Sequence, residues 1–176
     1  MMTLSSSELV TVATSGLVAL LSGGAGAWLV GRKRELRFFK NAKRPVFLFE
    51  FGEKLSSAKA ALQDTGFIPN VEGPFSSPAD ADRIGRAGLV VISFPSEPHQ
   101  PDQETEEHKR QKELFFQVFE KAKQRDLPIL VYAEGGGIKR CFARLAYSRA
   151  AVCNFQLRLI SDVFAVLSTY PEQKQP

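Results

Sequence analysis

Apolar and polar residues alternate along the chain in blocks of two different periods. Short, β-rich apolar runs occur at 46–51, 67–71, 89–94, 128–132 and 151–155. Between them, apolar residues recur at helical spacing over 55–64, 77–86, 104–125, 139–149 and 157–169. Strands that alternate with helices favour a parallel sheet with helices on both faces. We therefore expect an α/β fold, a five-stranded parallel three-layer sandwich.

The longest apolar block precedes this pattern. Residues 9–30 are 22 consecutive uncharged positions, which at about 1.5 Å per residue cross a hydrocarbon core of roughly 30 Å. Between Arg32 and Arg44 there are seven Lys or Arg and one acid, and basic residues stay on the cytoplasmic side. A cleaved signal peptide is the alternative, because Ala25-Gly26-Ala27 resembles a cleavage site, but residues 1–8 lack the positive charge of a signal peptide.

We therefore expect a single-pass protein of the cell (inner) membrane with its N-terminus outside. The predicted parts are a short extracytoplasmic N-terminus (1–8), a transmembrane helix (9–30), a basic juxtamembrane segment (31–44), a cytoplasmic Rossmann-like domain (45–170) and a tail (171–176).

The net charge of +4 comes from the juxtamembrane segment. Residues 1–44 hold seven bases and two acids, which leaves 16 bases and 17 acids in the domain. A near-neutral domain lacks the basic stripe that duplex nucleic acid requires. The basic segment instead favours anionic membrane lipid as a partner.

Small residues recur at every fourth position of the apolar block, notably at Ser15, Ala19, Gly23 and Ala27. Positions four apart share one helix face, so this row lets a second helix approach closely. Small residues are also common in membrane helices generally. We expect a homo-oligomer through this face; the block holds no ionisable residue for an ion relay.

In a flavodoxin-like parallel sheet, ligands bind beyond the carboxyl ends of the strands, where the strand order reverses. The segments that follow strands one, three and four are 52–57, 95–97 and 134–140. The last has glycines that let the backbone approach an anion and bases at the start of the next helix. Its candidate ligand-binding residues are Glu134, Gly135, Gly136, Gly137, Lys139 and Arg140. A strand-to-helix turn in which glycine only supplies positive φ is the alternative.

Several segments resemble a TIR domain. They are the strand at 46–51, the helix that ends at Gly66, the segment 84–94, and the stretches 112–114 and 123–132. The resemblance implies a flavodoxin/TIR-like fold. In enzymatic TIR domains the helix before the fourth strand carries a glutamate that cleaves NAD, and Glu113 matches that position. A membrane-bound NAD glycohydrolase with Glu113 as its catalytic residue is therefore an alternative function.

The segment 135–139, followed by 141–150 and 151–155, is similar to part of a CARF domain. CARF domains are Rossmann-like sensors of cyclic oligonucleotides whose glycine-rich loop ends in lysine and opens a helix. The resemblance implies a nucleotide-type ligand. Bacterial antiviral defence is a natural setting for both families.

Other catalytic chemistry finds little support in the sequence. His99 and His108 fall in a polar stretch and are predicted to be solvated, and the spacing of Cys141 and Cys153 gives no metal signature. We expect no permanently bound cofactor and no metal. The aromatic face Phe115, Phe116 and Phe119 is predicted to be core.

The hypothesis is a membrane-tethered sensor that binds a nucleotide-like anion and acts through oligomerisation of its membrane helix. A non-enzymatic anchor that recruits a protein partner remains the third alternative.

Overall fold

The computed structural model describes residues 28, 30–95, 104–133, 138 and 142–170. The chain divides into two compact units, Met1–Leu36 and Arg37–Pro176. The predicted transmembrane segment and its small-residue row lie outside the described residues, except for Trp28 and Val30. Within the part that is described, no helix has the length and hydropathy to cross a bilayer.

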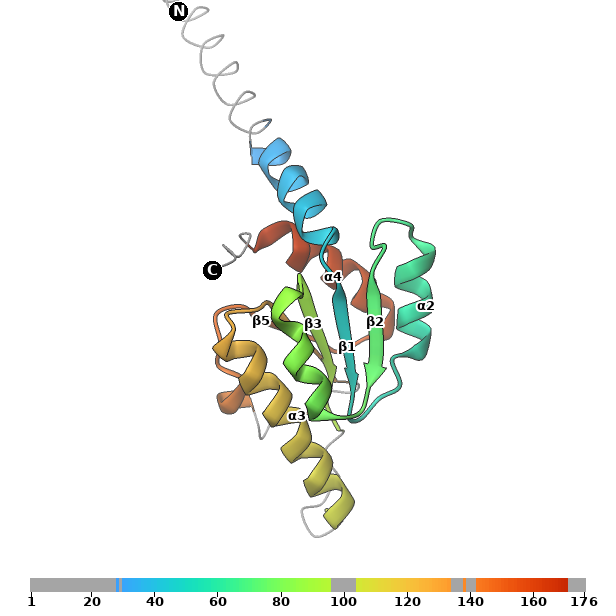
Figure 1. The fold of residues 1–176 in the computed structure, drawn as a ribbon, viewed down its shortest axis with the longest axis vertical. Helices are drawn as coiled ribbons and strands as arrows, with labels where there is room; N and C mark the ends of the chain where they lie inside the picture. The colour runs from blue at the N-terminus through green and yellow to red at the C-terminus, as the bar shows by residue number, and fades with distance from the viewer. Residues whose placement is uncertain (1–27, 29, 96–103, 134–137, 139–141, 171–176) are drawn as a thin grey trace, which may run out of the picture. The chain divides into compact units, whose positions relative to one another are not determined.

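The second unit contains a five-stranded sheet. Its strands are β1 (Val46–Glu50), β2 (Val71–Phe75), β3 (Leu89–Ser93), β4 (Ile129–Tyr132) and β5 (Ala150–Cys153). All neighbouring strands are parallel and the order is β2-β1-β3-β4-β5 (Figure 1). The predicted α/β class and parallel sheet are confirmed. The chain first adds β2 on one side of β1 and then continues on the other, so the strand order reverses between β1 and β3.

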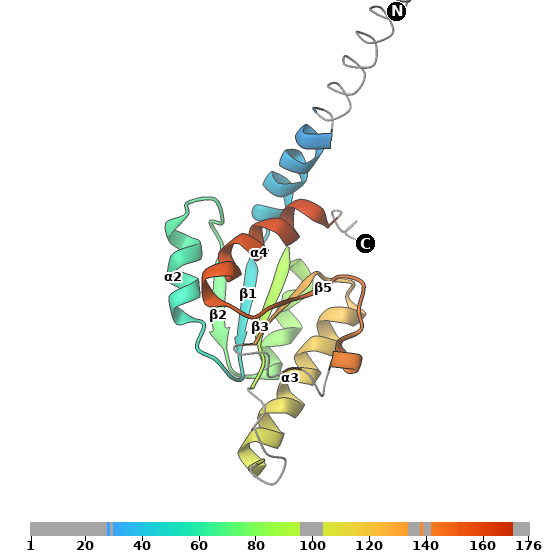
Figure 2. The same cartoon turned by 180° about the vertical axis from the view of Figure 1, so that it is seen from behind.

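Helices cover both faces of the sheet (Figures 1 and 2). On one face, α2 (Ser56–Asp64) contacts α4 (Gln156–Thr169), and on the other η1 (Pro78–Arg86) contacts α3 (Glu106–Gln124). A short 3-10 helix, η4 (Phe142–Leu145), precedes β5. Each face has its own hydrophobic cluster: Phe47 and Phe49 of β1 belong to the α3 side, and Val46 and Leu48 to the α4 side. This double burial explains why β1 is apolar from Val46 to Phe49.

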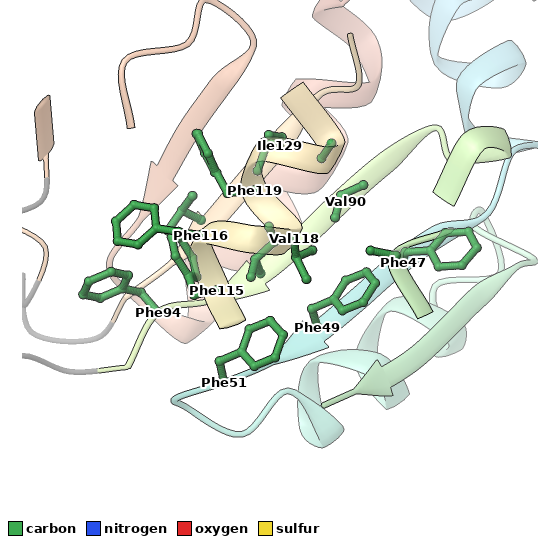
Figure 3. Close-up of a cluster of buried hydrophobic side chains, with 14 of the residues drawn as sticks. Phe47, Phe49, Phe51, Val90, Phe94, Phe115, Phe116, Val118, Phe119 and Ile129 are labelled. Carbon is green, nitrogen blue, oxygen red and sulfur yellow. The ribbon is translucent and has the colours of Figure 1, made fainter. Parts of the chain in front are cut away.

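The aromatic face of α3 is core, as predicted. Phe115, Phe116 and Phe119 are at most 8% exposed, and Phe94 meets Phe115 edge to face at 4.9 Å between ring centroids. Figure 3 shows these rings beside the phenylalanines of β1.

Three predicted elements are corrected by the structure. The second strand is Val71–Phe75 instead of 67–71: it contains Gly73 and Pro74, which an edge strand with one hydrogen-bonded neighbour tolerates. The segment 77–86 is helical but of the 3-10 type. The predicted helix 139–149 is wrong at 146–149, where the chain leaves η4 and turns into β5.

Candidate functional site

The carboxyl edge of the sheet has a pocket on the β1 and β2 side. Its cavity volume is about 350 Å³, within the range of small-molecule sites. The described residues that line it come from the ends of β1 and β2 and from the first half of α3: Glu50, Phe51, Gly52, Ser76, Glu107, Arg110, Gln111 and Leu114. The pocket is therefore beside the point where the strand order reverses.

The backbone after β1 is fastened to the end of β3. Glu50 and Ser93 are register partners, and the buried Ser93 Oγ accepts hydrogen bonds from the amides of Phe51 and Gly52, both at 3.1 Å. A Cβ on Gly52 would lie 2.3 Å from the Phe94 carbonyl oxygen, so only glycine allows this approach. The loops after strands one and three, which the sequence indicated for inspection, are thus in direct contact.

The Glu50 carboxylate holds the start of the next helix. Its Oε2 accepts a hydrogen bond of 2.8 Å from the Leu55 amide, just before α2. One wall of the pocket is therefore rigid backbone with a partly engaged carboxylate. Backbone held in this way is preorganised for a ligand, because binding then orders fewer groups.

The opposite wall is one face of α3. Glu107, Arg110, Gln111 and Leu114 follow one another at helical spacing, so they share a face that borders the buried one. The Thr105 hydroxyl caps the helix by accepting from the His108 amide at 3.2 Å. The side chains that reach the pocket are hence of mixed charge, with one guanidinium, two carboxylates and an amide.

His108 is more enclosed than the sequence predicted. Its side chain is 15% exposed, and its Nε2 has no hydrogen-bond partner among the described residues. Glu104 Oε1 lies 3.9 Å from this nitrogen and 3.0 Å from Lys112 Nζ. The Lys112 hydrogen bond lowers the pKa of the Glu104 carboxyl. The expectation of a solvated His108 was therefore wrong. Glu104, His108 and Lys112 are four residues apart, and this spacing is the sequence signal that the three side chains share one face of α3.

Glu113 lies on the other flank of α3, away from the residues that line this pocket. It borders a separate depression of about 370 Å³ together with Phe116, Gln117, Glu120 and Arg144. The Arg144 guanidinium covers the Phe116 ring, 3.6 Å from its centroid. Glu113 itself is exposed.

The predicted glycine-rich site, Glu134 to Gly137 with Lys139 and Arg140, lies outside the described residues. Its neighbours are described: Ala133 and Ile138 are both buried in the cluster beneath α3. The Ala133 amide donates to the Cys153 carbonyl at 2.9 Å, so the end of β4 is held against β5.

Among the described residues, no group of three His, Cys, Asp or Glu side chains is placed to hold a metal ion. Comparison of the chain with known protein families, curated proteins and solved structures finds no match.

Proposed function

We propose that the chain is a membrane-anchored signalling protein whose α/β domain binds a nucleotide-type ligand at the carboxyl edge of its sheet. The observation that carries this proposal is the pocket of about 350 Å³ beside the reversal of strand order. Ligands of doubly wound sheets bind beyond the carboxyl ends of the strands at such a reversal, because the loops on either side diverge there. This pocket adjoins the reversal on its β1 side.

The side chains at the pocket suit a ligand with both anionic and hydroxyl groups. Arg110 offers a planar donor group for a phosphate, whereas Glu50 and Glu107 offer acceptors for the hydroxyls of a sugar. The Gly52 backbone runs too close to the Phe94 carbonyl for any side chain, so this part of the pocket wall is main chain. Lys139 and Arg140 follow β4 in the sequence and would add positive charge from the same edge.

Binding would act by shifting the population between assembled forms. The small-residue row at Ser15, Ala19, Gly23 and Ala27 supports a helix–helix contact in the bilayer that such a shift would alter. In this scheme the domain performs no chemistry and has no resident cofactor. Antiviral defence remains the setting that the family resemblances imply.

The test is thermal unfolding of the full chain in lipid nanodiscs with ATP, NAD and cyclic oligonucleotides. A ligand that binds only the folded chain raises the melting temperature with concentration, by about 2.7 kcal/mol of stability at 100 times Kd. We expect Arg110→Gln to weaken binding at least about tenfold, the loss of one charged hydrogen bond. Lys109→Gln is the matched control, because Lys109 pairs with Glu106 at 2.7 Å and is not among the residues lining the pocket. Equal affinities of the two variants would contradict the site.

NAD cleavage through Glu113 is the second candidate, and the depression beside Glu113 and Arg144 favours it. It predicts nicotinamide release that disappears in Glu113→Gln and persists in Glu120→Gln, since Glu120 lines the same depression about two turns along α3. Nicotinamide release unaffected by Glu113→Gln, or none at all from the intact chain, would remove this candidate. An absence of any ligand effect would favour the anchor that recruits a protein partner.

A further inference from the structure

Four phenylalanines gather at the amino edge of the sheet, opposite the pocket. The rings of Phe38, Phe67 and Phe164 lie within 5.2 to 6.4 Å of one another, centroid to centroid. Phe39 meets Phe38 edge to face at 5.7 Å. Phe38 and Phe164 pack on the α4-side core, so the inner half of this aromatic cluster belongs to the fold.

The outer half of the aromatic cluster faces solvent. Phe39 is 56% exposed and Phe67 is 59% exposed. Phe67 follows Gly66, whose φ of 69° ends α2 and turns the chain outward. Contact with Phe38 and Phe164 holds Phe67 in place while its surface stays open. Phe39 and Phe67 both contact Phe38, and two exposed rings on one aromatic cluster indicate an interaction surface.

The chain beside Phe39 is basic, because Lys40 and Lys43 are both exposed. Arg86 and Arg125 are also exposed at the amino edge, at the ends of η1 and α3 on the other face of the sheet. The acids at the same edge are Asp64 and Asp126, and the carboxylate of Asp126 is 3.1 Å from Arg149. The surface therefore combines exposed aromatic rings with an excess of positive charge.

Hydrogen bonds fix the basic and aromatic residues relative to the sheet. The buried Asn41 side chain donates to the carbonyls of Leu167 at 2.8 Å and Tyr170 at 3.1 Å, at the end of α4. A Cβ on Gly88 would lie 2.6 Å from the Asn41 carbonyl oxygen, so this turn also packs closely against the start of β3. Phe39, Lys40 and Lys43 flank Asn41 in the chain, so these contacts keep the backbone between them against the sheet.

We propose that the amino edge of the domain docks on the surface of an anionic lipid bilayer. Aromatic rings enter the headgroup layer while lysine and arginine side chains reach the lipid phosphates. A second copy of the chain fits this surface less well, because its own amino edge would bring like charges together. The inference rests on the membrane anchor of the proposed function, and it adds an orientation: docking would direct the carboxyl edge and its pocket toward the cytoplasm.

The test uses tryptophan fluorescence of the full chain in nanodiscs. Trp28 is the one tryptophan of the sequence, so Trp28→Phe provides a dark background. Phe67→Trp then reports on the amino edge and Phe155→Trp on the carboxyl edge, where Phe155 is 63% exposed just before α4. The nanodiscs contain phosphatidylcholine with brominated tails, which quenches tryptophan on contact, with or without phosphatidylglycerol.

We expect Phe67→Trp to be quenched at least twofold more than Phe155→Trp when phosphatidylglycerol is present. Adding Lys40→Glu and Lys43→Glu should remove the difference, because both substitutions reverse an exposed positive charge beside Phe39. For a chain that co-elutes with the nanodisc, equal quenching of the two variants would overturn docking. Quenching that does not depend on phosphatidylglycerol or on the two lysines would also overturn it. Failure to co-elute would overturn the anchor and the docking together. If, without lipid, the Phe67→Trp tryptophan became shielded from a soluble quencher as the protein concentration rose, the surface would bind a second copy of the chain instead.

Discussion

At the carboxyl edge of the sheet, polar side chains and tightly held backbone border a pocket, whereas at the amino edge exposed phenylalanines and lysines form an open surface. Both edges belong to the same parallel sheet and each uses a glycine where two segments cross closely, Gly52 at one and Gly88 at the other. The backbone packing at the two edges is therefore similar. The edges differ in their side chains, which are polar around the pocket and aromatic and basic at the amino edge.

The parallel arrangement explains this separation. All strands point the same way, so every loop after a strand is at one edge and every loop before a strand is at the other. Ser93 binds the loop after β1 at the carboxyl edge, and Asn41 binds the end of α4 at the amino edge. Recognition of a small ligand and contact with a large surface can thus change independently, without altering the core between them.

The largest predicted effect is on the free energy of unfolding, and it tests the close backbone approaches at Gly52 and Gly88. Gly52→Ala places a Cβ 2.3 Å from one backbone atom and 2.6 Å from two others, so a backbone shift is required. We expect a loss of about 3 kcal/mol in the free energy of unfolding, together with loss of ligand binding at the pocket. Gly88→Ala meets one backbone oxygen at 2.6 Å and should cost about 2 kcal/mol while leaving ligand affinity unchanged. Denaturant titration of the full chain in detergent measures both.

Gly85→Ala is the control for this pair. Its added Cβ would approach only the end of the long, exposed Arg125 side chain, at 3.0 Å, whose guanidinium donates to the carbonyl of the exposed Asp82 at 3.0 Å. Its stability should change by less than about 1 kcal/mol. If Gly52→Ala were as mild as Gly85→Ala, the close crossing at the carboxyl edge would be wrong.

A second prediction concerns the fastening of the amino edge. Asn41→Ala removes the donor to two carbonyls at the end of α4, and unpaired buried carbonyls should cost about 2 kcal/mol. Asn154→Ala is the matched control, because Asn154 is exposed at the other edge. Thermal unfolding of both variants decides the matter: an equal melting temperature would mean that Asn41 contributes no net stability. If docking depends on this fastening, Asn41→Ala should also reduce the lipid quenching of Phe67→Trp.

Much of the sheet could be predicted from the sequence because its central strands are buried on both faces. β1, β3 and β4 are apolar runs apart from Glu50 and Ser93 at the ends of β1 and β3, a pattern that few other structures require. Gly66 was predicted to end the first helix of the domain, and its positive φ confirms this. β2 was displaced in the prediction because an edge strand has one neighbour and accepts Gly73 and Pro74, which sequence rules assign to turns.

The candidate site was predictable only in part. The rule for parallel sheets identified the loops after β1 and β3, and Gly52 does line the pocket. The contribution of α3 was missed, because Glu107, Arg110 and Gln111 lie in the predicted helix 104–125, in which Glu113 was the candidate site residue. Their orientation depends on where the helix begins, at the cap Thr105, and on which face the phenylalanines bury. Spacing from Leu114 back to Glu107 is the signal that could have indicated this face.

The smallest predicted effect compares the two ends of β5 by pH. Burial raises the pKa of the Cys153 thiol from 9.0 to about 11 at the carboxyl end, and burial with the Asp126 hydrogen bond raises that of Tyr147 from 10.0 to about 12 near the amino end. Both groups hold their proton more tightly in the folded chain, so the stability they contribute is fully present below pH 9 and falls as pH rises through 11 and 12. Between pH 8 and 10.5 the melting temperature of the intact chain should fall by about 3 °C more than that of Cys153→Ala. Tyr147→Phe should diverge only above pH 10, because its ordinary pKa is higher. If the melting temperature changed with pH in the same way for all three chains, neither Cys153 nor Tyr147 would contribute to the pH dependence of stability. The two edges would then differ only in the residues at their surfaces.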